Sequence, residues 1–214
     1  MATEFKLDPA QIAQWSQPLL LEEARLPDQI WQRLADYVEL LGRWNQRMNL
    51  TAVRQPRELV ERHVAECLRC AQLIPAGVKT LLDFGSGAGL PGIPILLART
   101  EISVTLAESQ TKKANFLREA LRVLQCANGE VYGGRVEDMP RDRMFDAVVL
   151  RAVDNMKEAI PASLARISPQ GTYALLTTEV QIDALSAQPN IDWRTPDRVP
   201  GSQQRVIAVG TFKG

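Results

Sequence analysis

The chain has 214 residues, of which 45% are hydrophobic and 23% are charged, as expected of a globular protein that can bury one sizeable core. Its 25 Lys and Arg residues balance 25 Asp and Glu residues, so the zero net charge gives no overall attraction to nucleic acid. We find no basic n-region with an apolar h-region and no run of about 18 apolar residues, which argues against secretion and membrane spanning. Three cysteines, an odd number, are consistent with reduced thiols. We therefore expect a cytoplasmic protein.

Residues 1–74 have a helical pattern. Pro27–Asp28 and Gln55–Pro56 are typical helix starts, and Met48–Val53 interrupts the pattern as a loop or extended piece. Between the first start and this interruption, large apolar residues recur at intervals of three and four: Trp31, Leu34, Val38, Leu41 and Trp44. This part predicts a helical N-terminal extension packed on the rest of the protein.

Residues 75–214 alternate between strand and helix patterns, which predicts an α/β core with a parallel sheet covered by helices on both faces. The expected strands are Thr80–Phe84, Ser103–Glu108, Glu130–Tyr132, Ala147–Arg151, Tyr173–Thr178 and Arg205–Phe212. The expected helices are Pro91–Arg99, Lys112–Gln125 and Met156–Ile167. The last strand is expected to be antiparallel.

A glycine-rich turn, Asp83–Gly92, directly follows the first expected strand and predicts a site for a nucleotide-like cofactor. Three of its glycines alternate with other residues: Gly85, Gly87 and Gly89. Glycine suits such a turn because, without a Cβ, it adopts positive φ and lets the backbone lie against a ligand. The turn continues through Leu90, which we also place at the cofactor. A glycine-rich connection without a ligand is the alternative.

Two carboxylates indicate which cofactor this turn binds. The pattern also fits a dinucleotide fold, but a carboxylate at Asp83 would repel the pyrophosphate that such a fold binds. S-adenosylmethionine carries an ammonium and a sulfonium, which Asp83 attracts. Glu108, about 20 residues on, can accept hydrogen bonds from both ribose hydroxyls. Alternatively, Asp83 caps the next helix and Glu108 is a solvated strand end.

Further candidates follow the third and fourth strands, because ligands of open parallel sheets bind beyond the carboxyl ends of strands. Val136 and Glu137 can hold an adenine ring by its face and its amino group. Arg151 can bind the cofactor carboxylate or a substrate phosphate as a forked donor. An ion pair between Arg151 and a carboxylate such as Asp83 or Asp154 is the alternative.

His63, Cys67 and Cys70 have the spacing of metal ligands on one helix face, but a closed zinc site needs four ligands and the chain offers no second such cluster. We favour a buried helix stripe and expect no metal. His63 either contacts substrate or braces the helical extension against the sheet. Several cations on the expected helices are candidates for RNA phosphates, with a solvated helix face as the alternative: Arg43, Arg47, Lys112 and Lys113.

The chain resembles the glucose-inhibited-division-B family of bacterial small-subunit rRNA guanine-N7 methyltransferases, from about residue 31 to 174. The segments that carry the resemblance are Trp44–Thr51, Arg62–His63, Asp83–Pro94, Lys112–Leu117, Arg135–Glu137 and Arg151–Ala152. The resemblance implies a Rossmann-like S-adenosylmethionine-dependent methyltransferase acting on 16S rRNA or a precursor of the small ribosomal subunit. It also implies that Gly85, Leu90, Val136, Glu137 and Arg151 stand at the family's cofactor-binding positions. We expect a monomer that binds neither DNA nor membranes.

Three positions depart from the family pattern. Glu66 replaces the aspartate that commonly follows the histidine, Leu176 replaces a lysine, and Gln204 stands at an expected arginine, with Arg205 one place along. Guanine N7 is already nucleophilic, so methyl transfer needs alignment but no general base. No catalytic residue is therefore assigned with certainty, and Arg151 and His63 remain the candidates. A small-molecule methyltransferase and a non-catalytic S-adenosylmethionine-binding RNA or assembly factor are the alternative functions.

Overall fold

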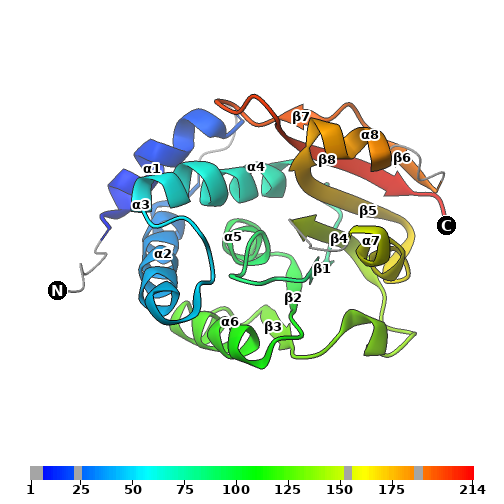
Figure 1. The fold of residues 1–214 in the computed structure, drawn as a ribbon, viewed down its shortest axis with the longest axis horizontal. Helices are drawn as coiled ribbons and strands as arrows, with labels where there is room; N and C mark the ends of the chain where they lie inside the picture. The colour runs from blue at the N-terminus through cyan, green and yellow to red at the C-terminus, as the bar shows by residue number, and fades with distance from the viewer. Residues whose placement is uncertain (1–6, 22–25, 152–155, 186–189) are drawn as a thin grey trace.

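The computed structural model of the protein describes residues 7–21, 26–151, 156–185 and 190–214. An eight-stranded sheet with the order β3-β2-β1-β4-β5-β8-β6 forms its centre, and β7 pairs with β8 (Figure 1). The strands are β1 (Thr80–Phe84), β2 (Ser103–Ala107), β3 (Gly129–Tyr132), β4 (Phe145–Arg151), β5 (Ile167–Thr178), β6 (Ile191–Trp193), β7 (Asp197–Arg198) and β8 (Arg205–Phe212). The predicted α/β class is confirmed.

Strands β1 to β5 run parallel, and β8 pairs antiparallel with β5, as predicted for the last strand. All six predicted strands are present. Strands β6 and β7 were not predicted, because they have only three and two residues and so short a stretch shows no period-2 pattern. Both pair with β8 and extend the antiparallel end of the sheet.

Helices cover both faces of the sheet. Beyond the short helical turns, they are α1 (Pro9–Ser16), α2 (Asp28–Met48), α3 (Pro56–Leu59), α4 (Ala65–Leu73), α5 (Gly92–Ala98), α6 (Thr111–Val123), α7 (Met156–Leu164) and α8 (Glu179–Leu185). Alternation along β4 shows the two faces: Ala147 and Val149 join the core under α4, α5 and α6, whereas Val148 and Leu150 join the core under α7. The predicted two-sided cover is confirmed.

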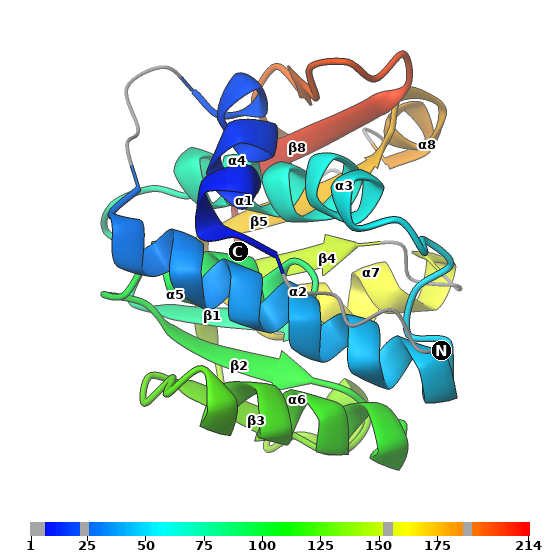
Figure 2. The ribbon, with the colours of Figure 1, turned by 90° about the vertical axis from the view of Figure 1, so that its left-hand side faces the viewer.

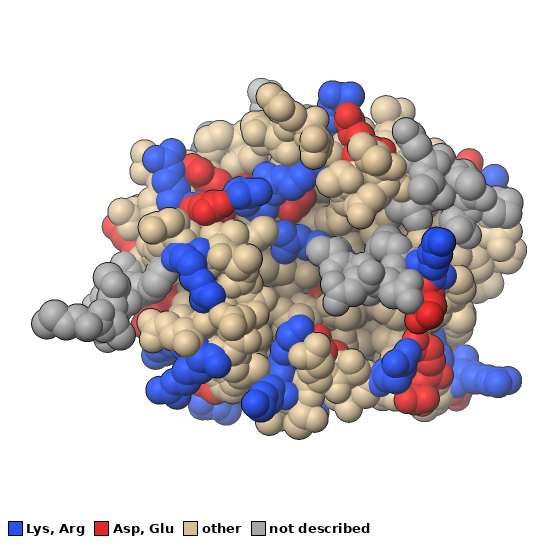
Figure 3. Space-filling model, viewed as in Figure 1, with Lys and Arg blue, Asp and Glu red and all other residues tan. Residues whose placement is uncertain are grey.

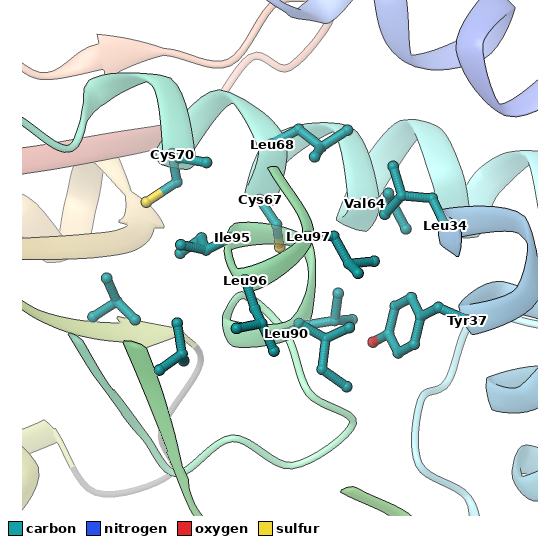
Figure 4. Close-up of a cluster of buried hydrophobic side chains, with 14 of the residues drawn as sticks. Leu34, Tyr37, Val64, Cys67, Leu68, Cys70, Leu90, Ile95, Leu96 and Leu97 are labelled. Atoms are coloured by element: carbon teal, nitrogen blue, oxygen red, sulfur yellow. The ribbon is translucent and has the colours of Figure 1, made fainter. Parts of the chain in front are cut away.

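The helical extension shares one hydrophobic core with the sheet. The predicted apolar stripe lies on α2, which begins after Pro27 as expected, and in Figure 2 this helix crosses in front of α5 and β1. Figure 4 shows the contact layer, where Tyr37 of α2 points towards Leu90, Leu34 of α2 lies beside Val64, and Cys67 of α4 lies above α5. Full burial of such side chains contributes about 1.5–3 kcal/mol each. In the described part of the chain, no helix is both long and apolar enough to span a bilayer.

The last helix of the extension is continuous but irregular. Between α3 and α4 the backbone forms a π-helical segment, η2 (Val60–Val64), so the chain is helical from residue 56 to 73. The segment carries Arg62 and His63. Single π-turns of this kind often occur at functional sites because they change the direction of side chains within a helix.

Candidate functional site

The candidate site lies at the carboxyl ends of β1, β2 and β4. In the strand order, β1 stands between β2 and β4, which is the point where an open parallel sheet binds its ligand. Two hollows of about 340 Å³ and about 620 Å³ meet there, and Gly85 lines both of them. The smaller hollow is lined by Phe84, Gly85, Ala107, Ser109, Gly134, Arg135, Val136, Glu137, Glu158 and Ala159. The larger hollow is lined by Leu50–Val53, Arg62, His63, Gly85–Ala88, Leu90, Glu108, Gln110, Lys113 and Arg151.

The predicted glycine turn forms the wall that the two hollows share. Gly85, Gly87 and Gly89 all have positive φ, so this backbone path disfavours residues with a side chain. A Cβ on Gly89 would lie 2.4 Å from Cδ1 of Ile93, whereas a Cβ on Gly87 would meet nothing closer than 3.8 Å. Gly89 therefore serves packing, and Gly87 leaves open space next to the hollow. The Tyr37 hydroxyl of α2 donates to the carbonyl of Ala88 at 2.7 Å and holds the turn from outside.

Asp83 does not line either hollow. Its side chain is buried, and its Oδ2 accepts a hydrogen bond from the amide of Gly92 at 3.1 Å, at the start of α5. The carboxylate therefore caps that helix, the alternative considered from the sequence, and the proposed direct attraction of a ligand charge needs correction. Its other oxygen, Oδ1, is buried without a hydrogen-bond partner among the described residues. Burial raises the pKa of Asp83 to about 7, against opposing hydrogen bonds.

Glu108 connects the tips of two neighbouring strands. It follows β2 and is largely buried; Oε2 accepts from the Gly87 amide at 3.0 Å and Oε1 accepts from the Gln110 amide at 2.7 Å. Each carboxylate oxygen has a further lone pair, so the group can still accept bonds from a ligand in the larger hollow. The solvated strand end considered from the sequence does not describe this residue.

Val136 and Glu137 follow β3, as predicted. They lie in a short helical turn, η3 (Val136–Asp138). Val136 is 4% exposed and packs into the core under α7, and both residues line the smaller hollow. An apolar side chain next to an acidic one gives this hollow an apolar contact and a hydrogen-bond acceptor.

Arg151 ends β4 and belongs to a cluster of four side chains. Its Nη2 contacts Nδ1 of His63 and lies 3.5 Å from Oε2 of Glu66, which also lies 3.3 Å from Nη1 of Arg205. The ion pair considered as the alternative for Arg151 thus exists, but its partner is Glu66. The Asp83 carboxylate accepts from Gly92 instead, and Asp154 lies outside the described residues. His63 links the helical extension to the sheet and also lines the larger hollow.

His63 is uncharged at neutral pH. Burial, followed by the nearby Arg151 and Arg205, lowers its pKa to about 3. A guanidinium can only donate hydrogen bonds, so the Nδ1 that Arg151 contacts is an acceptor and the ring proton is on Nε2. The ring therefore adds no positive charge to the site.

The loop after α2 forms the outer wall of the larger hollow, and the Trp44–Thr51 segment explains its shape. Asn49 ends α2 in the left-handed conformation with φ of 50°. Asn45 is buried and its Oδ1 accepts from the Thr51 amide at 2.9 Å. Arg54 donates to the Asn49 side chain at 2.8 Å and to the Asn45 carbonyl. These bonds fix residues 50–53 against the hollow.

The helix that carries His63, Cys67 and Cys70 uses its two thiols in the core. Cys67 and Cys70 are both 0% exposed in the core, and His63 faces Arg151. The buried-stripe interpretation of this helix is confirmed for the two thiols. Among the described residues, no group of three or more possible ligands is suited to a metal ion.

Cations surround the larger hollow, as the space-filling view in Figure 3 shows for this face of the molecule. Of the four cations expected to bind RNA, Lys113 lines the hollow itself. Arg43, Arg47 and Lys112 are exposed, and Arg43 lies 4.0 Å from Glu39 on the same helix. Arg62, which was not among the predicted site residues, also lines the hollow.

Besides Arg62, the structure adds three residues that the sequence did not assign to the site: Tyr37, Glu66 and Arg205. Tyr37 lies on the same face of α2 as the predicted stripe, so the sequence pattern alone predicts an ordinary core residue. The cation expected at Gln204 is supplied by Arg205, which points to α4, and Leu176 is a buried neighbour of Arg151 in the sheet. For Glu66 and Arg205 the sequence signals were the spacing of Glu66 from His63 and the place of Arg205 next to Gln204.

Comparison with known proteins identifies the family. Residues 30–201 match the GidB family, described as rRNA small subunit methyltransferase G. The chain belongs to this family. A ribosomal RNA small subunit methyltransferase G of Xanthomonas euvesicatoria pv. vesicatoria is 40% identical over 85% of this chain and 86% of the relative. The protein of that name in Methylobacillus flagellatus is 35% identical over 76% of this chain and 78% of the relative. The GidB protein described here is therefore an enzyme of the methyltransferase class.

Solved structures agree with this fold assignment. The glycopeptide N-methyltransferase MtfA, in complex with S-adenosylmethionine, superposes with a TM-score of 0.59 at 12% identity, over 71% of this chain and 88% of that one. A predicted O-methyltransferase of Agrobacterium tumefaciens gives a TM-score of 0.56 at 19% identity, over 69% and 81%. At such identities the likeness concerns the fold, and it confirms the expected Rossmann-like methyltransferase core.

Proposed function

We propose that this GidB protein transfers a methyl group from S-adenosylmethionine to N7 of a guanine in 16S rRNA. Family membership supports methyl transfer to small-subunit rRNA. The observation that carries the site assignment is the meeting of two hollows at Gly85, over the tips of β1, β2 and β4. One extended ligand that crosses this glycine would occupy both hollows, as a nucleoside joined to an amino acid requires.

Each part of this cofactor has suitable partners. In the smaller hollow, Val136 offers an apolar surface for adenine and Glu137 an acceptor for its amino group. Glu108, which lines the larger hollow, has free lone pairs for ribose hydroxyls. In the larger hollow, Arg151 matches the carboxylate of the amino-acid end. The glycine turn from Gly85 to Leu90 allows the backbone to approach, and Asp83 holds that turn to α5.

When bound, S-adenosylmethionine supplies an electrophilic methyl group on a sulfonium. The protein's task is then to orient the guanine, because unprotonated N7 needs no general base. His63 suits this setting since it is neutral and its Nδ1 is committed to Arg151. We therefore regard Arg151 and His63 as binding and orienting residues, and place the target base between residues 50–53 and the glycine turn.

The direct test uses small ribosomal subunits from a strain that lacks this enzyme, incubated with purified protein and methyl-labelled S-adenosylmethionine. Chemical cleavage at N7-methylguanine should give one new band in 16S rRNA. Label on small metabolites alone would favour a small-molecule methyltransferase. Cofactor binding without transfer to rRNA would favour a non-catalytic assembly factor. Naked 16S rRNA in a parallel reaction shows whether the substrate is the RNA or the particle.

The RNA surface has its own test. We also propose that the enzyme acts as a cytoplasmic monomer, and that cations around the larger hollow neutralise RNA phosphates. The second proposal is tested as follows. A triple alanine variant should weaken rRNA binding and reduce its salt slope by about 2–3 if every cation contacts a phosphate, because each contact contributes about 0.7–0.9. Its affinity for S-adenosylmethionine should not change. An unchanged salt slope would show that these side chains are ordinary surface. The substituted residues are Arg43, Arg47 and Lys112.

A further inference from the structure

Glu66 joins two arginines that come from different parts of the sheet. Arg151 ends β4 and Arg205 begins β8, and β5 separates these strands in the sheet. Glu66 projects from α4, with a side chain only 3% exposed, and a single oxygen, Oε2, lies 3.5 Å from Arg151 and 3.3 Å from Arg205. The carboxylate therefore occupies the space between two guanidinium groups.

The charges explain why this arrangement needs the carboxylate. Arg151 and Arg205 are both largely buried, with side chains 15% and 23% exposed, so water screens their mutual repulsion only weakly. His63 cannot compensate, because it is neutral and accepts a hydrogen bond from Arg151. The backbone carbonyl of Arg62 takes a bond from Arg205 but carries no net charge. Among the described residues, Glu66 is the one anion paired with Arg151.

We propose that Glu66 is a positioning residue, which holds Arg151 in place for the carboxylate of the cofactor and offsets the charge of Arg205. The proposal rests on the proposed function, because it takes Arg151 as a cofactor-binding residue. With Glu66 ionised, the side chains of Glu66, Arg151 and Arg205 together carry one net positive charge, which suits the single carboxylate of the cofactor. Without it, the same volume holds two repelling cations and Arg151 moves away from its present position.

The test measures the dissociation constant of S-adenosylmethionine by calorimetry on full-length variants. E66Q keeps the shape of the side chain and removes its charge, so affinity should fall at least tenfold. E66D keeps the charge and should stay within about threefold of the wild type. In the double variant E66Q/R205Q the repelling cation is also gone, so part of the lost affinity should return. A purely structural role predicts no such recovery.

Asp197 provides the matched control. Arg69, which lies on α4 like Glu66, donates two hydrogen bonds to the Asp197 carboxylate, and neither residue lines the hollows. D197N should lower thermal stability and leave the dissociation constant unchanged. Wild-type affinity in E66Q, or equal losses in E66Q and D197N, would overturn the proposal. If E66Q does not fold, E66Q/R205Q is compared with R205Q, and equal affinities overturn it. A wild-type protein that binds no S-adenosylmethionine would instead refute the proposed function.

Discussion

The buried carboxylate of Asp83 should make the stability of the protein depend on pH near neutrality. The group is 1% exposed, and its pKa is about 7, compared with 3.8 for a free side chain. The folded state therefore binds a proton more tightly than the unfolded state. The stabilising contribution is fully present below about pH 4 and is lost as the pH rises through about 7.

The size of the effect follows from the two pKa values. A difference between 3.8 and about 7 corresponds to about 4 kcal/mol over the whole range, at about 1.4 kcal/mol per pH unit in between. Asp83→Asn removes this titration, because the amide is neutral at every pH. Relative to the wild type, the variant should gain about 2–3 kcal/mol between pH 4.5 and 6.5.

Urea unfolding at several pH values measures this difference directly, because titrations common to both proteins cancel. Asp146→Asn is a suitable control. The Asp146 carboxylate accepts bonds from the amides of Lys79 and Thr80, and these bonds outweigh burial and lower its pKa. Its contribution is lost as the pH falls below about 4, so the control should show a constant difference between pH 4.5 and 6.5. A constant difference for Asp83→Asn as well would refute the reasoning.

Three further substitutions separate the fold from the site. Gly87→Val should abolish S-adenosylmethionine binding in calorimetry with only about 1–2 kcal/mol lost in urea unfolding, since φ is +54° but a Cβ meets no atom closer than 3.8 Å; unchanged affinity would contradict this placement of the turn. Gly92→Ala should cost several kcal/mol, because its Cβ would lie 2.3 Å from Leu106, whereas Gly77→Ala, with nothing within 4 Å, should be neutral in the same assay. Tyr37→Phe should cost about 1–2 kcal/mol by removing the bond that holds the turn, and equal unfolding midpoints would refute that role.

Local patterns in the sequence were sufficient for the fold class and for the position of the glycine turn. The strand from Thr80 to Phe84 agrees with the structure at both ends, because a buried apolar run is bounded there by the glycine turn. The stripe of α2 followed from a 3.6-residue period that needs no knowledge of its partner. Sequence order also placed Glu108, Val136 and Arg151 at strand ends, and the parallel sheet brings those ends to one edge.

Only the tertiary structure determined which way the charged groups point and with whom they pair. The sequence suggested that Asp83 faces a ligand, but packing against α5 turns it towards the amide of Gly92. Glu66 and Arg205 lie 139 positions apart in the sequence, and only folding brings Oε2 of Glu66 within 3.3 Å of Nη1 of Arg205. Periodicity reports which face of an element is apolar. It carries no information about which distant charges meet, because that depends on how helices cross strands and on the free energy of burying each charge.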